Sequence, residues 1–329
     1  MLFWRNTSSE SDYKNGVYEL KSIEIGGIKQ WLLIRGRNKD NPILLFLHGG
    51  PGSAQISIAK HYFSRLEENF LVVNWDQRGA GLSYSRDIPK ETMNVKSFVS
   101  DAKELIDYLR KTYNKEKIFL VGHSWGSALG VLTANKYPEL IEAYIGVGQV
   151  GDMVELERIA YKYVNDYAHK TNNTKAIEEL ERIGEPPYKD SVKCIKVRSK
   201  WTGKFHVRIY RDDMKKLVLR MLTSSEYAFG DVFKLLKGGN YSVDSMWEEV
   251  SKLNLEEQVP ELKMPVYFIT GRHDYTVPFE TSLKYFEKLK APFKENIWFE
   301  DSAHCMPFEE PDKFQGTIID KLSSVLKQC

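Results

Sequence analysis

Ser124 lies in a setting that could make its hydroxyl a nucleophile. It is the central residue of GHSWG, residues 122–126, which follows the apolar run KIFLV and precedes a stretch of helical character. A GxSxG pattern between a buried strand and a helix is typical of a sharp turn whose strained backbone exposes the serine hydroxyl, with the glycines leaving room for it. We therefore predict a catalytic nucleophile at Ser124. The alternative is a Gly/Ser-rich turn that merely joins the two elements.

Asp274 and His304 are the predicted acid and base for this serine. A serine hydroxyl becomes nucleophilic when a base takes its proton, and a histidine base needs an acid that fixes its tautomer. Asp274 in GRHDYTVP and His304 in DSAHCMP each follow the end of a predicted strand, and Ser, Asp, His is the chain order of the α/β hydrolases. His273 has no strand-end acid after it at a suitable interval, and Asp301 is too close to His304 to come from a separate loop. The predicted triad is therefore Ser124, Asp274 and His304.

A glycine-rich segment could supply the third requirement of acyl transfer, a pair of backbone donors for the developing oxyanion. HGGPG, residues 48–52, follows the apolar run ILLFL. We predict the Gly50 amide as the first donor and the amide of Trp125, the residue after the nucleophile, as the second. A plain Gly-Pro turn is the alternative. His48 has no companion at metal-ligand spacing, so we interpret it as structural and predict no metal site.

The elements that must position these residues alternate between strand and helix. A hairpin is predicted over 17–35 with its turn at Gly26-Gly27. Nearly continuous apolar runs at 42–50, 70–76, 117–122 and 141–148 predict buried parallel strands, with helices at 53–69, 94–113 and 125–137 between them. After residue 150 the strand pattern stops and returns at 264–271, followed by a helix near 279–290, a strand at 295–300 and a last helix near 311–327.

This order predicts an α/β-hydrolase fold, with a mostly parallel central sheet and helices on both of its faces. The core is expected to comprise residues 1–150 and 263–329. Residues 151–262 carry charged helical patterns such as VELERIAYKYVNDYAHK and are expected to form a helical cap inserted between core strands.

Composition restricts the possible partners. Lys and Arg number 47 against 45 Asp and Glu, a formal net charge of +2, so neither nucleic acid nor a membrane surface is expected as a partner. Cys194, Cys305 and Cys329 have no disulfide or zinc spacing, which suits a cytoplasmic protein. The first residues are too weakly apolar for a signal peptide, and no run approaches the roughly 20 apolar residues of a membrane span. Without a glycine-rich nucleotide fingerprint after the first core strand, no cofactor is predicted.

Five motifs stand in a familiar order: HGGPG, WDQRGAG at 75–81, GHSWGS at 122–127, GRHD at 271–274 and SAHC at 302–305. With them the chain resembles the proline iminopeptidase (prolyl aminopeptidase) branch of the α/β hydrolases. The resemblance implies a serine hydrolase that releases N-terminal residues, preferentially proline, from small peptides through an acyl-enzyme without a metal. By position it assigns the triad and oxyanion roles to the residues named above. It also implies a structural role for Asp76 and Arg78.

Two positions depart from that family. Its members bind the free amino terminus of the peptide with acidic residues of the cap and, in some cases, one directly after the triad aspartate, where this chain has Tyr275. Among the cap acids, which include Glu157 and Glu248, we expect Glu155 and Glu226 to take that role. His123 stands where the peptidases often have glycine and many esterases have histidine.

Three functional hypotheses therefore stay open. The first is an aminopeptidase of the proline iminopeptidase type. The second is a carboxylesterase or lactonase-type hydrolase of small acyl substrates that uses the same triad. The third is a ligand-binding protein that kept the fold without catalysis. Epoxide hydrolases and dehalogenases carry a carboxylate at the elbow, whereas position 124 is serine.

Overall fold

The computed structural model describes residues 14–205, 207–210 and 214–327. Within these ranges the strands form one eight-stranded sheet in the order β1-β2-β4-β3-β5-β6-β7-β8. Their bounds are β1 Val17–Ile25, β2 Ile28–Gly36, β3 Ile43–Leu47, β4 Leu71–Asp76, β5 Ile118–His123, β6 Ile141–Val147, β7 Val266–Gly271 and β8 Lys294–Phe299. β2 is antiparallel to β1 and β4, and the remaining pairs are parallel. The predicted mostly parallel central sheet is confirmed.

The first hairpin forms where the sequence predicts it. Gly26 and Gly27 have φ of 55° and 74°, which is the positive-φ pair that a two-residue hairpin turn of the favoured twist requires. Glycine adopts this conformation without the steric penalty of a Cβ. The hairpin places β1 at one edge of the sheet, and β8 lies at the other edge.

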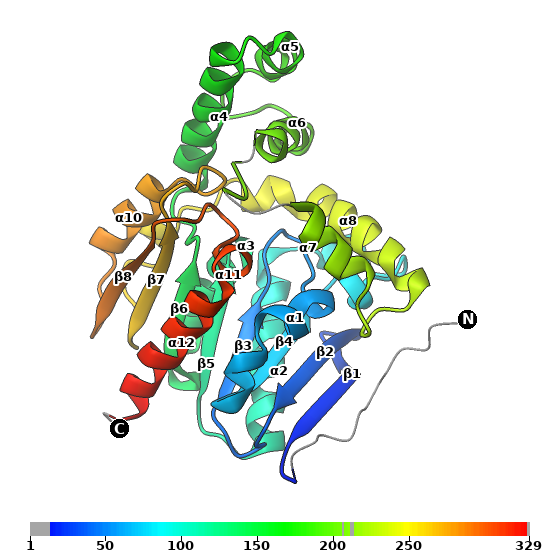
Figure 1. Ribbon diagram of the computed structural model, residues 1–329, viewed down its shortest axis with the longest axis vertical. Coiled ribbons are helices and arrows are strands. Elements are labelled where there is room, and N and C mark those ends of the chain that lie inside the picture. The colour runs from blue at the N-terminus through cyan, green and yellow to red at the C-terminus, as the bar shows by residue number, and fades with distance from the viewer. Residues whose placement is uncertain (1–13, 206, 211–213, 328–329) are drawn as a thin grey trace.

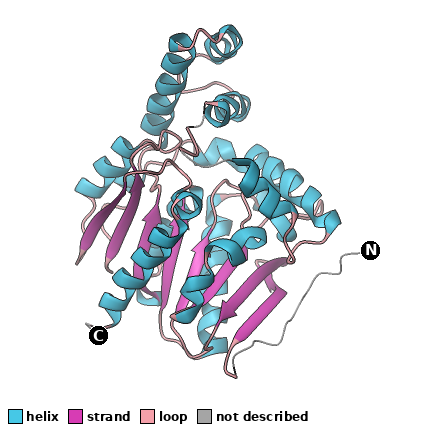
Figure 2. Ribbon diagram, in the orientation of Figure 1, coloured by secondary structure: helices cyan, strands magenta, loops and turns pink. Residues whose placement is uncertain are grey.

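Helices cover both faces of the sheet (Figures 1 and 2). α2 (Val95–Tyr113) begins at the N-cap Asn94, whose side chain accepts a hydrogen bond of 2.9 Å from the Ser97 amide, and its apolar stripe packs in one core cluster together with α3 (Trp125–Lys136) and α10 (Phe279–Lys288). α1 (Ile56–Tyr62) and α12 (Pro311–Leu326) pack in a second cluster on the opposite face, with the short α11 (Met306–Glu309) beside them. Both layers bury the sheet that carries the site residues.

The single helix predicted over 53–69 is wrong in its extent. The segment forms α1 and then a separate 3₁₀ helix at Ser64–Glu68, with the break at Phe63. Phe63 has φ of −127°, outside the helical range, and its ring stacks on Phe46 of β3 with centroids 4.5 Å apart. Burial of that ring in the core therefore overrides the continuous helical pattern.

All helices of the segment between β6 and β7 lie on one side of the molecule, at the carboxyl ends of the parallel strands (Figure 1). They are α4 Met153–Lys170, α5 Thr174–Ile183, α6 Ser191–Lys204, α7 Met214–Leu222, α8 Val232–Val250 and the short α9 Leu255–Gln258. α4, α5 and α6 project away from the sheet and share a small core of their own around Val164, Leu180 and Trp201. The start of α4, through Met153 and Leu156, packs in the main core, and so do Leu255, Val259 and Leu262.

None of the helices in the described ranges combines the length and the hydropathy that crossing a bilayer requires.

Candidate active site

Ser124 forms the turn between β5 and α3 with φ of 57° and ψ of −122°, a strained conformation for a residue with a Cβ. The glycines on either side are needed for close backbone approach. A Cβ on Gly122 would lie 2.2 Å from the carbonyl oxygen of Gly126, and a Cβ on Gly126 would lie 2.0 Å from the carbonyl oxygen of Leu47 at the end of β3. The Ser124 amide donates to Val147 of β6 at 2.9 Å. The turn is therefore held between the neighbouring strands.

Asp274 and His304 form a buried hydrogen-bonded pair. His304 Nδ1 lies 2.8 Å from Asp274 Oδ2, and the two residues are 4% and 1% exposed. The other carboxylate oxygen, Oδ1, accepts hydrogen bonds of 2.9 Å from the amides of Thr276 and Val277. Because the carboxylate is an acceptor, Nδ1 carries the proton and Nε2 is the basic nitrogen. This is the arrangement that a general base in acyl transfer requires.

His123 connects the elbow to the loop that carries His304. Its Nε2 donates to the main-chain carbonyl of His304 at 2.8 Å, and the two imidazole rings lie 4.9 Å apart. Burial, and then the neighbouring His304, lower the pKa of His123 to about 3, so this side chain stays neutral. In the described chain Ser124 Oγ has no direct hydrogen bond to His304, a contact that often tightens only with substrate bound.

The HGGPG loop lies against the elbow. A Cβ on Gly49 would come within 3.1 Å of the Ser124 Cβ, and Gly50 has φ of 122°, where a Cβ would lie 2.4 Å from the Gly52 amide nitrogen. Trp125 is the first residue of α3, so its amide is among the unpaired donors of a helix N-terminus. The structure thus brings the Gly50 loop and the start of α3 to the same serine, and the oxyanion roles of Gly50 and Trp125 stay predictions.

Hydrogen bonds between His48 and Gln77 fix this loop. The part played by Gln77 was not predicted from the sequence. His48 Nε2 accepts from the Gln77 amide at 3.1 Å, and Nδ1 donates to the Gly49 carbonyl at 2.8 Å. The Gln77 side chain donates to the His48 carbonyl and accepts from the Trp125 indole, each at 3.0 Å. Complete burial lowers the pKa of His48 to about 4, so it is a neutral structural residue. The position of Gln77 inside the DQRGAG motif is the feature of the sequence that could have indicated its role.

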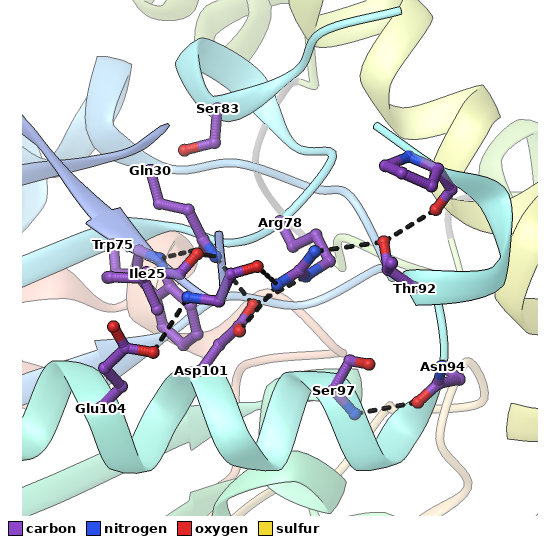
Figure 3. A network of polar contacts seen from close by, with 12 residues as sticks. Ile25, Gln30, Trp75, Arg78, Ser83, Thr92, Asn94, Ser97, Asp101 and Glu104 are labelled. Atoms are coloured by element: carbon purple, nitrogen blue, oxygen red, sulfur yellow. Dashed lines mark hydrogen bonds and ion pairs between the residues drawn. The ribbon is translucent and has the colours of Figure 1, made fainter. Parts of the chain in front are cut away.

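Arg78 joins four separate segments (Figure 3). Its guanidinium makes two hydrogen bonds of 2.8 Å to Asp101 of α2, one of 3.0 Å to the Gly26 carbonyl in the hairpin turn and one of 3.1 Å to Thr92 Oγ1. Gln30 of β2 donates to the same carboxylate at 2.7 Å. Arg78 therefore braces the frame around the site and does not face the reacting groups.

Asp76, at the end of β4, has a similar bracing position. Its carboxylate accepts from the Leu82 amide at 2.9 Å and from the hydroxyl of Tyr227, which lies between α7 and α8. Complete burial raises the pKa of Asp76 to about 6. The contact with Tyr227 fixes part of the cap to the core.

The two cap carboxylates predicted to bind an amino terminus have other partners. Glu155 forms an ion pair with Lys284 of α10. Glu226 is 2% exposed and accepts from the Ser224 hydroxyl at 2.7 Å and from Tyr18 of β1 at 3.0 Å. Since β1 is four strands from β5 and strands lie about 4.8 Å apart, this end of the sheet is about 19 Å from the elbow. These contacts give the amine-binding role no support, and it stays a prediction.

The sequence did not predict the aromatic contact and the cavity that the structure shows in the cap. Tyr275, directly after the triad aspartate, stacks on Tyr163 of α4 with ring centroids 3.7 Å apart and planes 10° apart. A cavity of about 460 Å³ lies at the base of the cap and is lined by Glu157, Trp247 and Tyr188 among others, but by none of the triad. Within the described residues no three His, Cys, Asp or Glu side chains gather as a metal site would.

Comparisons with known proteins agree with this geometry. A family model described as the alpha/beta hydrolase fold matches residues 42–182. The chain is 36% identical over 312 residues to the probable aminopeptidase YbaC of Bacillus subtilis, covering 93% of this chain and 96% of the relative. It is 38% identical over 288 residues to the proline iminopeptidase of Clostridium botulinum, covering 84% and 88%. The chain belongs to the proline iminopeptidase family.

Solved structures of lower sequence identity have the same fold. The crystal structure of the proline iminopeptidase of Mycobacterium smegmatis matches with a TM-score of 0.68 at 18% identity, over 93% of this chain and 98% of that one. VinJ matches with a TM-score of 0.69, also at 18% identity, over 93% and 98% of the two chains. The two relatives of 36% and 38% identity confirm the family resemblance inferred from the five motifs.

Proposed function

We propose that this protein is a serine aminopeptidase that releases N-terminal residues, with proline preferred, from small peptides. The observation that carries the proposal is the buried pair of His304 and Asp274, on a loop that His123 ties to the Ser124 elbow. The names of the relatives, a probable aminopeptidase and a proline iminopeptidase, support the substrate class. Buried cysteine thiols at 194 and 305 suit the cytoplasm, where we place the protein.

In this proposal the Ser124 oxygen attacks the carbonyl carbon of the first peptide bond while His304 Nε2 takes the hydroxyl proton. Asp274 holds the imidazole and stabilises its charged form. The amides of Gly50 and Trp125 donate to the oxyanion of the tetrahedral intermediate. His304 then gives the proton to the leaving amine as the carbon–nitrogen bond breaks. Water attacks the acyl-enzyme by the same route, and the N-terminal residue leaves as a free amino acid.

Substrate panels test the proposal against its alternatives. We expect aminoacyl p-nitroanilides, with the prolyl compound fastest, to be cleaved with a higher kcat/KM than p-nitrophenyl esters of simple acids. Rapid ester turnover without any aminoacyl anilide cleavage would instead support the esterase or lactonase hypothesis.

Covalent labelling tests whether the protein is an enzyme at all. A fluorophosphonate should label the wild type and fail to label Ser124→Ala, because only an activated serine reacts. Ser324→Ala, which removes an exposed hydroxyl on α12, is the matched control and should label like the wild type. A wild type that does not label would favour a ligand-binding protein.

A further inference from the structure

The short connection at residues 207–210, between α6 and α7, lies directly on the loop that carries the catalytic histidine. The main-chain carbonyl of Arg208 accepts from the amides of His304 and Cys305 at 3.1 and 3.2 Å. Two residues on, the Tyr210 ring stacks on His273 with centroids 3.6 Å apart, and its amide donates to Glu309 at 2.6 Å. The backbone of Arg208 is therefore fixed beside the imidazole that would act as base and acid.

The side chain of Arg208 is half-buried, and its charge acts on groups beside the same loop. Its Nε is buried without a hydrogen-bond partner, and in the described part of the chain no carboxylate forms an ion pair with the guanidinium. The charge acts on His123 and Cys305, which are next to Ser124 and His304 in the sequence. Beyond the larger effects of burial and His304, it helps to lower the pKa of His123, and it opposes the rise that burial gives the pKa of Cys305.

Two buried arginines of this protein show which partner a guanidinium requires away from water. Arg78 pairs with Asp101 and Arg198 pairs with Glu157, each through two hydrogen bonds to one carboxylate. A guanidinium is a fork of donors that matches a carboxylate, and a buried polar group left unpaired costs free energy. Arg208 has the same chemistry, but among the described residues it has no such acid, so an external carboxylate is the ligand that fits it.

We propose that Arg208 binds the carboxylate of the leaving amino acid, which makes dipeptides the preferred substrates; this inference rests on the proposed aminopeptidase function. His304 must give its proton to the leaving amine, so the leaving group lies against the loop to which Arg208 is bound. In a dipeptide the carboxylate is separated from that nitrogen by only one Cα. Each further residue moves it away by about 3.5 Å.

The test compares prolyl-alanine with prolyl-alaninamide, which differ only in the terminal charge, and uses prolyl p-nitroanilide as an indicator of the basic activity. We expect the wild type to cleave the free acid with a kcat/KM about 10- to 100-fold above that of the amide, as a charge-assisted bidentate contact provides. In Arg208→Gln that ratio should fall to near one. Arg208→Lys, which keeps the charge without the fork, should have an intermediate ratio.

Arg158→Gln is the matched control, since it removes one positive charge from an exposed position on α4 and should keep the wild-type ratio. A wild type that cleaves the anilide but treats acid and amide alike would overturn the role of Arg208 and leave the aminopeptidase function standing. An unchanged ratio in Arg208→Gln, checked for folding by thermal unfolding, would overturn it as well. Failure to cleave any of the three substrates would remove the proposed function and this inference together.

Discussion

Two buried arginine–carboxylate pairs, one in the core and one in the cap, hold the two parts of this enzyme in different ways. Arg78 and Asp101 are 3% and 1% exposed, and their pair also contacts the first hairpin and the 3₁₀ turn before α2. Arg198 and Glu157 are 3% and 4% exposed, but they join only α6 to α4. The core pair therefore cross-links segments far apart in the chain, whereas the cap pair joins two neighbouring helices.

The difference bears on function because the proposed reaction depends on the core side of the site. Ser124, Asp274 and His304 all follow core strands, and the amides of Ser124 and Asp274 donate to carbonyls of the core, whereas the His304 amide donates to Arg208 in the connection between α6 and α7. The cap contributes local contacts, such as the stack of Tyr163 on Tyr275. We expect changes in the core to affect catalysis or global stability, and changes in the cap to affect substrate choice.

The largest effect is expected for Asp274→Asn. An amide at this position can no longer fix the proton on Nδ1 of His304 or stabilise its charged form, so kcat for prolyl p-nitroanilide should fall by about 10⁴-fold. Steady-state kinetics measure the loss. The thermal midpoint should change little, because Asn still offers an acceptor to the amides of Thr276 and Val277. A decrease below tenfold would contradict the assignment of Asp274 as the triad acid.

The places of Ser124, Asp274 and His304 after core strands were predictable from sequence, because position in this fold follows from strand order; their roles as a triad stay a prediction. Each of the three residues stands within a few positions after the end of a predicted strand, and parallel strands end at a common edge. Gly122 and Gly126 were predictable for a steric reason, since any Cβ would collide with backbone there. Phe63 shows the limit: its burial against Phe46 ends a helix that the local pattern alone continues.

The cap contacts could not be predicted in the same way. Which face of α4 meets the core depends on how long helices pack against each other and not on a motif, so Glu155 could not be placed against Lys284 from its spacing. Arg208 lies in a connection without periodicity, and its contact with His304 spans almost one hundred positions of the chain. No local signal marks such a residue.

Removing Arg78 should cause the largest loss of stability. Arg78→Met leaves the Asp101 carboxylate buried with only Gln30 as a donor, which should lower the free energy of unfolding by about 3–5 kcal/mol. Denaturant unfolding followed by circular dichroism gives the change. Activity at a temperature where the variant is folded should be close to that of the wild type, since Arg78 does not face the reacting groups.

Arg198→Met provides the matched control in the cap. Arg198 makes its contacts within α4 and α6 alone, whereas Arg78 also binds the hairpin turn and Thr92, so fewer contacts are lost and the decrease should be smaller, about 1–3 kcal/mol. The comparison between core and cap would fail if Arg198→Met destabilised the protein as much as Arg78→Met.

The pH dependence of stability should reveal the neutral His123. Its pKa in the folded protein is about 3, below the ordinary value of 6.5, so the unfolded chain takes up the proton first. The free energy of unfolding should therefore fall as the pH drops from 6.5 towards 3, by at most about 1.4 kcal/mol per pH unit from this residue. In His123→Gln, whose amide can still donate to the His304 carbonyl, the fall should be shallower by that amount. Equal slopes for the two proteins would show that His123 is not held neutral. The pKa of His48 is also lowered, and this residue contributes equally to the slope of both proteins.

The smallest effect is expected for Glu155→Gln. If Glu155 bound the amino terminus of the substrate, its replacement would raise KM for prolyl p-nitroanilide by tenfold or more, as loss of a charged contact does. Its carboxylate is instead paired with Lys284 and partly exposed to solvent, so we expect KM to change by less than about twofold. Lys284→Met is the control, because it frees the Glu155 carboxylate without removing it. A tenfold rise in KM in Glu155→Gln alone would return the amine-binding role to this residue and give the cap a direct part in binding the substrate.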